Sequence, residues 1–446
     1  MIRRLIVTLL RFTLRVYFRR VEVAGLEHVP RKSAVIFVLN HPNALVDPAF
    51  LFCLAPRRIS FLAKAPLFTM PVIGYFVRAL DSLPVYRKQD EGQDVSRNRE
   101  TFAAARALLT RGGTLAVCPE GVSHDTPGLR PIKTGTARIA LGAVSGGEAL
   151  DLKIVPAGLY YTAKTTFRSA ALLYFGKSIE VTRVELEPGG DPPREAVRDL
   201  SDKIEEALRE VILDAQQEEA LQTIARAEKI FSSEGNDAET SLTTELQLRQ
   251  RFIKGYRWLR EQSPERLGKL EARITRFEEQ LRLAGVDPED FSPPKSAAAF
   301  FRHLLLRGLV FLLLLGPALV GIVVHFVAYR LGGFLSTRFS QNSEDVVSTI
   351  KIISAMLLFP LTWLVLALVA FRLAAWPLGV ATLFVLPLTG YAAIRFLEGL
   401  DTFLGGLRAL VFFLMRRRFF VRLLAERKAI KAEILTLGKE ATLAIR

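Results

Sequence analysis

The chain has 446 residues, of which 50% are hydrophobic, and 60 lysines and arginines against 45 acidic residues give it a net charge of +15. Such a basic balance points to an anionic partner: nucleic acid, an anionic membrane surface or a phosphorylated small molecule. The soluble part has no zinc-finger spacing, RNP-type motif or basic-aromatic interleaving, which argues against nucleic acid. The two cysteines, Cys53 and Cys118, stand in apolar surroundings. They are expected to be buried, and they are too few for a disulfide framework.

The first 20 residues, MIRRLIVTLLRFTLRVYFRR, are expected to form a basic amphipathic helix. Arginines interrupt the apolar region and no small-residue cleavage site follows, so the segment is not typical of a signal peptide. On a helix, Arg4, Arg11, Arg15 and Arg19 share one narrow sector. We therefore expect a helix lying in the headgroup layer of a membrane, with its arginines facing phosphates. An ordinary surface helix packed on a soluble core is the alternative.

Residues 21–215 alternate short apolar runs with longer helical patterns. Strands are expected over 33–40, 59–64, 80–87, 114–121, 151–161 and, once or twice, 171–181. Helices are expected over 44–55, 99–109, 134–144 and 193–213. Alternation of this kind predicts an α/β domain, and the continuous apolarity of the strands predicts a mostly buried sheet covered by helices.

Residues 216–299 are rich in Glu, Gln, Arg and Lys and end in the breaker FSPPK. They predict a charged helical pair or short coiled coil without recognisable chemistry. Residues 300–400 form a membrane-spanning region, with C-terminal transmembrane helices expected at 308–328, 352–371 and 373–394.

The tail, residues 401–446, is basic and therefore expected in the cytoplasm. If the α/β domain is also cytoplasmic, an even number of crossings is required, and three do not fit. Either the second and third spans form one re-entrant hairpin, or residues 396–415 add a fourth.

His41 stands in the turn NHPN, directly after the buried strand AVIFVL. Open α/β sheets place their chemistry at the carboxyl ends of strands. Asp47 follows within reach of the imidazole, and a histidine oriented by a carboxylate is a general base for a hydroxyl proton. Taken alone, a single histidine at a turn is more often a structural residue.

The stretch CPEGVSHDTPGLRPIKTGTAR runs from a strand end to a helix start. Backbone N–H groups at the helix start, together with Arg130 and Lys133, would suit a phosphate. The loop SLPVYRKQD adds Arg87 and Lys88 after another strand. There is no G-x-S-x-G nucleophile motif, and no ligand cluster implies a metal.

These residues carry a family resemblance. The blocks NHPNALVD, AKAPLFTMPVIG, LPVYR, PEG and IVPAGL follow one another as in PlsC-type glycerolipid acyltransferases, over about residues 21–215. Two features depart from the usual pattern: five residues rather than four separate His41 from Asp47, and Ser123 takes the arginine position of PEGTRS. Together with PIKTG and the C-terminal spans, they resemble the fungal-type glycerol-3-phosphate/dihydroxyacetone-phosphate acyltransferases and their bacterial relatives.

The resemblance implies a membrane acyltransferase of phospholipid synthesis. His41 would remove a proton from a glycerol hydroxyl, which attacks the thioester of acyl-CoA or acyl carrier protein, while Asp47 holds the imidazole. No cofactor beyond this acyl-donor substrate is implied. The acceptor's phosphate is assigned to a set of residues in the loops after the strands: Arg87, Glu120, Gly121, His124, Arg130 and Lys133.

The acceptor is expected to be glycerol 3-phosphate or dihydroxyacetone phosphate, with lysophosphatidic acid as the alternative. A different class, a non-catalytic lipid-binding scaffold or lipid transport protein, is kept open by the C-terminal spans. Expected partners are membrane lipids, the phosphorylated acceptor and the acyl donor, and not nucleic acid. The expected location is a bacterial inner membrane, with the acyltransferase domain on its cytoplasmic face.

Overall fold

The structure is a computed structural model, and the residues that it describes are 1–87, 89–90, 94–126, 128–147, 149–214, 223, 226, 241–283, 297–341, 343–373 and 376–445. Two compact units make up the chain. The first comprises Met1–Gln216, Ser241–Leu246 and Ser336–Ile352, and the second comprises the rest. The first unit therefore contains a short stretch that lies more than a hundred residues further along the chain.

An eight-stranded sheet forms the centre of the first unit. Its strands are β1 (Arg20–Ala24), β2 (Ala34–Leu39), β3 (Ser60–Lys64), β4 (Leu83–Val85), β5 (Thr114–Val117), β6 (Leu152–Tyr161), β7 (Ala170–Phe175) and β8 (Ile179–Glu180). The order is β1-β7-β6-β2-β5-β3-β4, with β8 paired to β6. Only the pairings of β6 with β7 and β8 are antiparallel. Every residue of the central strand β2 is buried, as its continuous apolarity predicts.

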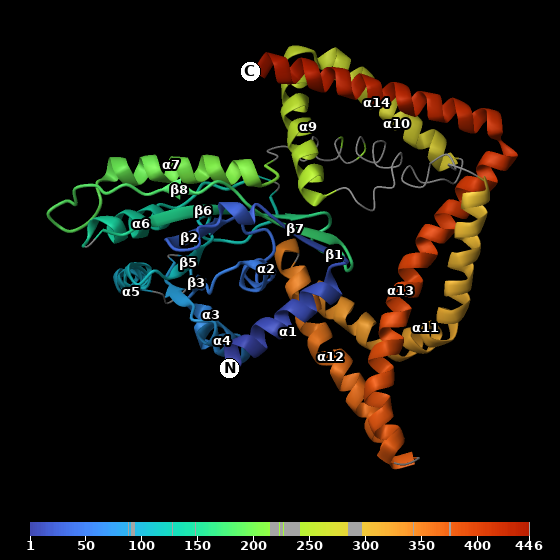
Figure 1. The fold of residues 1–446 in the computed structure, drawn as a ribbon, viewed down its shortest axis with the longest axis horizontal. Coiled ribbons are helices and arrows are strands. Elements are labelled where there is room, and N and C mark those ends of the chain that lie inside the picture. The colour runs from blue at the N-terminus through green and yellow to red at the C-terminus, as the bar shows by residue number, and fades with distance from the viewer. Residues whose placement is uncertain are drawn as a thin grey trace. The chain divides into compact units, whose positions relative to one another are not determined.

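Four helices lie close to their predicted positions: α2 (Val46–Leu54), α5 (Asn98–Thr110), α6 (Gly135–Ser145) and α7 (Arg194–Val211). The apolar faces of α5, α6 and α7 share one buried cluster with β2, β5 and β6, and the helices run along the sheet in Figure 1. The predicted α/β class is therefore confirmed. Strand β1 and helices α3 (Pro66–Thr69) and α4 (Pro71–Ala79) were not predicted. A proline opens each of these two helices, a position that tolerates it.

Helix α1 (Ile2–Tyr17) packs against α2 and α4. The four arginines expected to share an outward sector, Arg4, Arg11, Arg15 and Arg19, are all exposed. Arg11 donates to the Cys53 carbonyl at 2.7 Å, and Arg3 donates to the carbonyls of Ile59 and Leu80. These two arginines thereby bind α1 to the domain. The exposed surface of α1 also carries apolar residues: Ile2, Leu5, Leu9, Phe12 and Val16. A headgroup location for α1 stays a prediction.

In the second unit, the charged segment and the basic tail are partners. Helix α9 (Leu242–Gln262) leads into α10 (Pro264–Leu283), which packs against α14 (Arg417–Ile445). Arg273 on α10 donates to Glu426 at 2.7 Å and to Glu433 at 2.6 Å on α14. The tail is thus a helix with an acidic face as well as a basic one.

Three helices in the described part of the chain are long and apolar enough to cross a membrane, within Leu305–Phe339, Glu344–Leu373 and Trp376–Gly405. They belong to α11 (Ala297–Phe339), α12 (Glu344–Leu373) and α13 (Trp376–Met415). The three predicted spans fall on them, apart from the first residues of the third. Residues 396–415 continue α13 and do not form a separate fourth helix.

His325, within α11, has partners that the sequence did not reveal. Its Nδ1 lies 2.7 Å from the Gly321 carbonyl of the same helix, and Trp363 on α12 donates its indole N–H to Nε2 at 2.8 Å. Both ring nitrogens are therefore engaged within the second unit. This geometry gives His325 a structural role between α11 and α12.

Candidate active site

His41 and Asp47 meet at the carboxyl end of β2. The His41 Nδ1 lies 2.9 Å from Asp47 Oδ2, and the Asp47 side chain is fully buried at the start of α2. The Asn43 N–H donates to the same oxygen at 2.7 Å, and the Tyr161 hydroxyl donates to Oδ1 at 2.6 Å. Three donors thus fix the carboxylate. This arrangement stabilises its ionised form and the Nδ1–H tautomer of the imidazole.

The loop between His41 and Asp47 is bent at Ala44, whose φ is +33°. Few residues other than glycine adopt a positive φ, so the surrounding contacts must hold this loop in place. The Asn40 side chain forms two hydrogen bonds with the backbone of Leu159 on β6, at 3.0 and 2.7 Å. The His41 N–H donates to Glu120 Oε1 at 3.1 Å. The five-residue gap is accommodated by a short, tightly held turn.

The electrostatics of the site favour a strong base. Burial alone would lower the pKa of His41, but the hydrogen-bonded and negatively charged Asp47 carboxylate beside it raises the pKa well above its ordinary value. Burial, followed by the charge of Asp47, raises the pKa of Tyr161 well above its usual range, so its hydroxyl remains a donor. The imidazole side chain is 20% exposed. His41 can therefore accept a proton at Nε2 while Nδ1–H faces Asp47.

Cys118 lies beside this pair, close to the His41 side chain. Its apolar setting predicted an inert buried residue. Burial indeed raises the pKa of its thiol, so the sulfur is protonated at neutral pH and is not an activated nucleophile. Its contact with the candidate base was not predicted.

The Glu120 side chain is engaged by three groups of the protein. Its Oε1 accepts the His41 N–H, while Oε2 accepts the Arg130 N–H at 2.9 Å and bonds to His124 Nε2. The other ring nitrogen of His124 lies 2.5 Å from the Thr126 hydroxyl. Two of the phosphate contacts expected from the sequence, Glu120 and His124, are therefore engaged with protein groups. A carboxylate would in any case repel a phosphate.

Arg87, Gly121 and Lys133 come together at the neighbouring position. Arg87 donates to the Gly121 carbonyl at 2.7 Å and pairs with Asp90 at 2.6 and 2.8 Å. Gly121 has a φ of +76°, and a Cβ there would lie 2.6 Å from Lys133 Nζ, so only glycine lets the lysine approach this closely. The hydrogen bond from Arg87 lowers the pKa of Asp90, and the charges of Lys64 and Lys133 add to this effect.

We call Arg87, Lys64 and Lys133 the cation cluster. Arg87 and Lys133 were predicted to bind phosphate, as was Gly121, which contacts both of them. Lys64, at the end of β3, was not predicted. Arg130 is exposed and joins the site through its backbone N–H. Lys88 lies outside the described residues. Lys64, like Arg87, is a cationic residue at the carboxyl end of a strand. That position is the sequence signal that could have identified Lys64.

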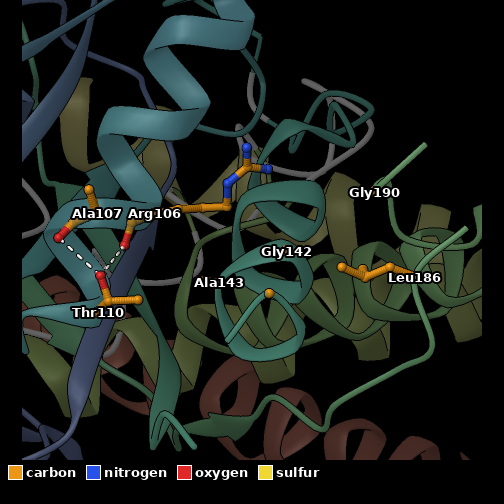
Figure 2. A pocket seen from close by; sticks show the side chains of 8 residues that line it. Arg106, Ala107, Thr110, Gly142, Ala143, Leu186 and Gly190 are labelled. Atoms are coloured by element: carbon orange, nitrogen blue, oxygen red, sulfur yellow. Dashed lines mark hydrogen bonds between the residues drawn. The ribbon is translucent and has the colours of Figure 1, made fainter. Parts of the chain in front are cut away.

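Within the described residues no group of three or more His, Cys, Asp or Glu side chains could hold a metal ion. A pocket of about 270 Å³ lies between α5, α6 and residues 186–190, with Arg106 beside Gly142 at its wall (Figure 2). Its lining includes none of the candidate site residues.

Two families match the chain, and their matches fall on different parts of it. The family described as "Acyltransferase" matches residues 20–160. The family described as "Glycerol-3-phosphate acyltransferase 2 C-terminal domain" matches residues 223–442. The chain is therefore homologous to the glycerol-3-phosphate O-acyltransferases of yeast, and its residues 20–160 match the acyltransferase family.

Among its relatives is glycerol-3-phosphate O-acyltransferase 2 of Saccharomyces cerevisiae, 28% identical over 62% of this chain and 39% of the yeast protein. Glycerol-3-phosphate O-acyltransferase 1 of the same yeast is 24% identical over 78% of this chain and 58% of its own length. The match thus spans less than two thirds of either yeast protein. The crystal structure of the 1-acyl-sn-glycerophosphate acyltransferase PlsC from Thermotoga maritima is 20% identical, with a TM-score of 0.34, and covers 47% of this chain and 79% of that one.

Proposed function

We propose that the protein transfers a fatty acyl group from an acyl thioester to a hydroxyl of glycerol 3-phosphate or dihydroxyacetone phosphate. One observation carries this proposal. Consecutive residues of one loop connect the two halves of the site: Glu120 holds the His41 backbone, and Gly121 contacts Arg87 and Lys133. A phosphate bound at the cation cluster would therefore place a short acceptor's hydroxyl towards His41.

The reaction needs a base, and His41 supplies it. His41 Nε2 takes the proton as the acceptor oxygen attacks the thioester carbonyl, and Asp47 stabilises the imidazolium that forms. The tetrahedral intermediate then expels the thiolate, which takes the proton from His41. The carbon–sulfur bond breaks, the ester bond remains, and His41 returns to its neutral form. The protonated thiol of Cys118 agrees with direct transfer, without an acyl-enzyme.

The test is an acyl-transfer assay on the purified protein in detergent with labelled acyl-CoA. Glycerol 3-phosphate, dihydroxyacetone phosphate and lysophosphatidic acid are offered separately. Product from either of the first two, absent with His41→Ala, is the expected result. Product from lysophosphatidic acid alone would assign the second acylation step to the protein. Lack of product from all three, with acyl-CoA and with acyl carrier protein as donors, would reject the proposal in favour of a lipid-binding scaffold.

We also propose that the acyltransferase domain and α14 both lie on the cytoplasmic face of the membrane that the C-terminal helices enter, which requires an even number of crossings. Residues 336–352 fold with the first unit, so α11 would enter the membrane without crossing it, and α12 and α13 would supply the two crossings. Arginines and lysines are frequent in α14, which follows the last apolar helix, and cytoplasmic segments carry such an excess. This location can be tested by introducing single cysteines into α14 and into the α6 region and labelling them in intact cells. Both should react only after the cells are made permeable, and reaction of either in intact cells would contradict the proposal.

A further inference from the structure

The first residues of α12 belong to the acyltransferase domain. Residues 336–352 fold with the first unit, although about three hundred residues separate them from the catalytic loop. Several of their polar side chains are buried: Asp345 is 4% exposed, Ser348 is fully buried and Thr349 is 9% exposed. Buried polar side chains at the start of a helix otherwise long enough to cross a membrane need a local explanation.

Part of the explanation is a set of anchors on the domain surface. The Tyr17 hydroxyl donates to Ser348 Oγ at 3.0 Å, and Ser348 in turn donates to the Lys164 carbonyl. Lys351 donates to the Thr165 carbonyl at 2.8 Å. The Glu344 N–H donates to Asp125 at 2.9 Å. These contacts fix the first turns of α12 to α1 and to the loops after β5 and β6.

Another contact reaches the candidate active site itself. The Leu45 N–H donates to Thr349 Oγ1 at 3.2 Å. Leu45 lies between His41 and Asp47 and directly follows Ala44, the residue with positive φ. Without Thr349 this half-buried backbone donor would lose its partner beside the one loop residue with a positive φ, and a donor without a partner is costly.

We propose that Thr349 is a positioning residue for the acyl-transfer reaction: its hydroxyl holds the loop in the conformation that presents His41 to Asp47. This inference rests on the proposed function for its kinetic test but not for its spectroscopic one. Thr349 acts through the loop and does not contact substrate. The start of α12 thereby completes a site that the rest of the domain only partly fixes.

The kinetic test compares three variants in the acyl-transfer assay. Thr349→Val keeps the shape but removes the acceptor, and kcat should fall about tenfold, the effect of one hydrogen bond to a buried donor, while KM for the acceptor changes little. Thr349→Ser keeps the hydroxyl and should retain kcat within about twofold of the wild type. Lys351→Met removes an anchor of the same helix that does not touch the loop, and its kcat should also stay within about twofold of the wild type.

A second readout is independent of the reaction. The His41 pKa in the full-length protein in detergent, followed by NMR of labelled histidine, should move from its raised value towards the ordinary one in Thr349→Val, because the imidazole loses its fixed place beside Asp47. The variant changes none of the ionisable groups around His41, which are Asp47, Cys118, Glu120, His124, Tyr161 and Asp345.

The outcomes separate the two proposals. An unchanged kcat and an unchanged His41 pKa in Thr349→Val would overturn the positioning role, as would equal losses in Thr349→Val and Lys351→Met. If Thr349→Val does not fold, Thr349→Ala removes the same acceptor with less steric demand. A wild-type protein that acylates no acceptor would overturn the proposed function alone, and the His41 titration would still decide the role of Thr349.

Discussion

The two halves of the candidate site are built in different ways. Around His41 and Asp47 the polar atoms are buried and held by Asn43, Glu120 and Tyr161. In the cation cluster, Lys64 and Lys133 are exposed, and Arg87 is paired with Asp90. The first half is rigid and depends on individual hydrogen bonds, whereas the second acts mainly through charge. Substitutions in the first should therefore change kcat, and substitutions in the second should change KM and its dependence on salt.

The largest expected effect is the loss of the base. His41→Ala should lower kcat about a thousandfold, within the usual contribution of general base catalysis. Asp47→Asn keeps the size of the side chain but removes the charge that favours the imidazolium, and it should also cause a large loss. Steady-state kinetics with the acceptor found in the assay measure both. A His41→Ala variant with near wild-type kcat would show that the half of the site around His41 and Asp47 does not carry out the reaction.

The pH dependence comes next. His41 must be neutral to accept a proton, and its pKa is raised. The fraction of neutral His41 therefore falls as the pH drops through this raised pKa, so kcat/KM should decrease about tenfold per pH unit below it. We expect the acid limb to lie above pH 6.5, the usual value for histidine. An acid limb below that pH would contradict the contribution of Asp47 to the raised pKa of His41.

The cation cluster should respond less strongly. Lys133→Met should raise KM for the phosphorylated acceptor about fivefold, with kcat nearly unchanged, because one exposed charge of the cluster is lost. The increase should shrink at high ionic strength, where salt already screens the site. Lys177→Met, at another exposed lysine, is the matched control. A large loss of kcat in Lys133→Met would remove the distinction between the two halves.

The smallest effect is expected at Cys118. Cys118→Ala should keep kcat within about threefold of the wild type, since a thiol with a raised pKa is not required for direct transfer. Mass spectrometry after mixing with acyl-CoA should find no acyl group on the wild-type protein. A labelled Cys118 thioester, together with a thousandfold loss in Cys118→Ala, would instead indicate a covalent acyl-enzyme.

Periodicity and strand order were enough to predict most of the first unit. The buried strands, their flanking helices and the placement of His41 at the end of β2 all follow from local patterns. Strand β1 was missed because RVEVA is short and charged, and it pairs with a strand about 150 residues away. Which strands become neighbours depends on contacts that no local pattern contains.

The same limit applies to the site. His41 and Asp47 are close in sequence, so their pairing was predictable. Tyr161 reaches Asp47 from a distant strand, and the role of Glu120 is set by its backbone partners at His41 and Arg130. Burial decides such roles. On an exposed surface the side chains of Glu120 and His124 could bind a substrate, but in the folded domain they are hydrogen-bonded to each other and Glu120 is also bonded to the backbone of His41 and Arg130. The contribution of Thr349 was the hardest to predict, because Thr349 lies just before an expected membrane span and about three hundred residues from the loop that it contacts.

The hydrogen bond between Leu45 and Thr349 also has a consequence for biosynthesis. A ribosome adding about 5–20 residues per second needs roughly 15–60 s to pass from one residue to the other. Well before that interval ends, the whole sheet and the His41–Asp47 pair have been synthesised, but the Leu45 N–H does not yet have Thr349 as its partner. The domain is thus completed only when the second apolar helix emerges, and this order links the assembly of the catalytic loop to the insertion of the chain into its membrane.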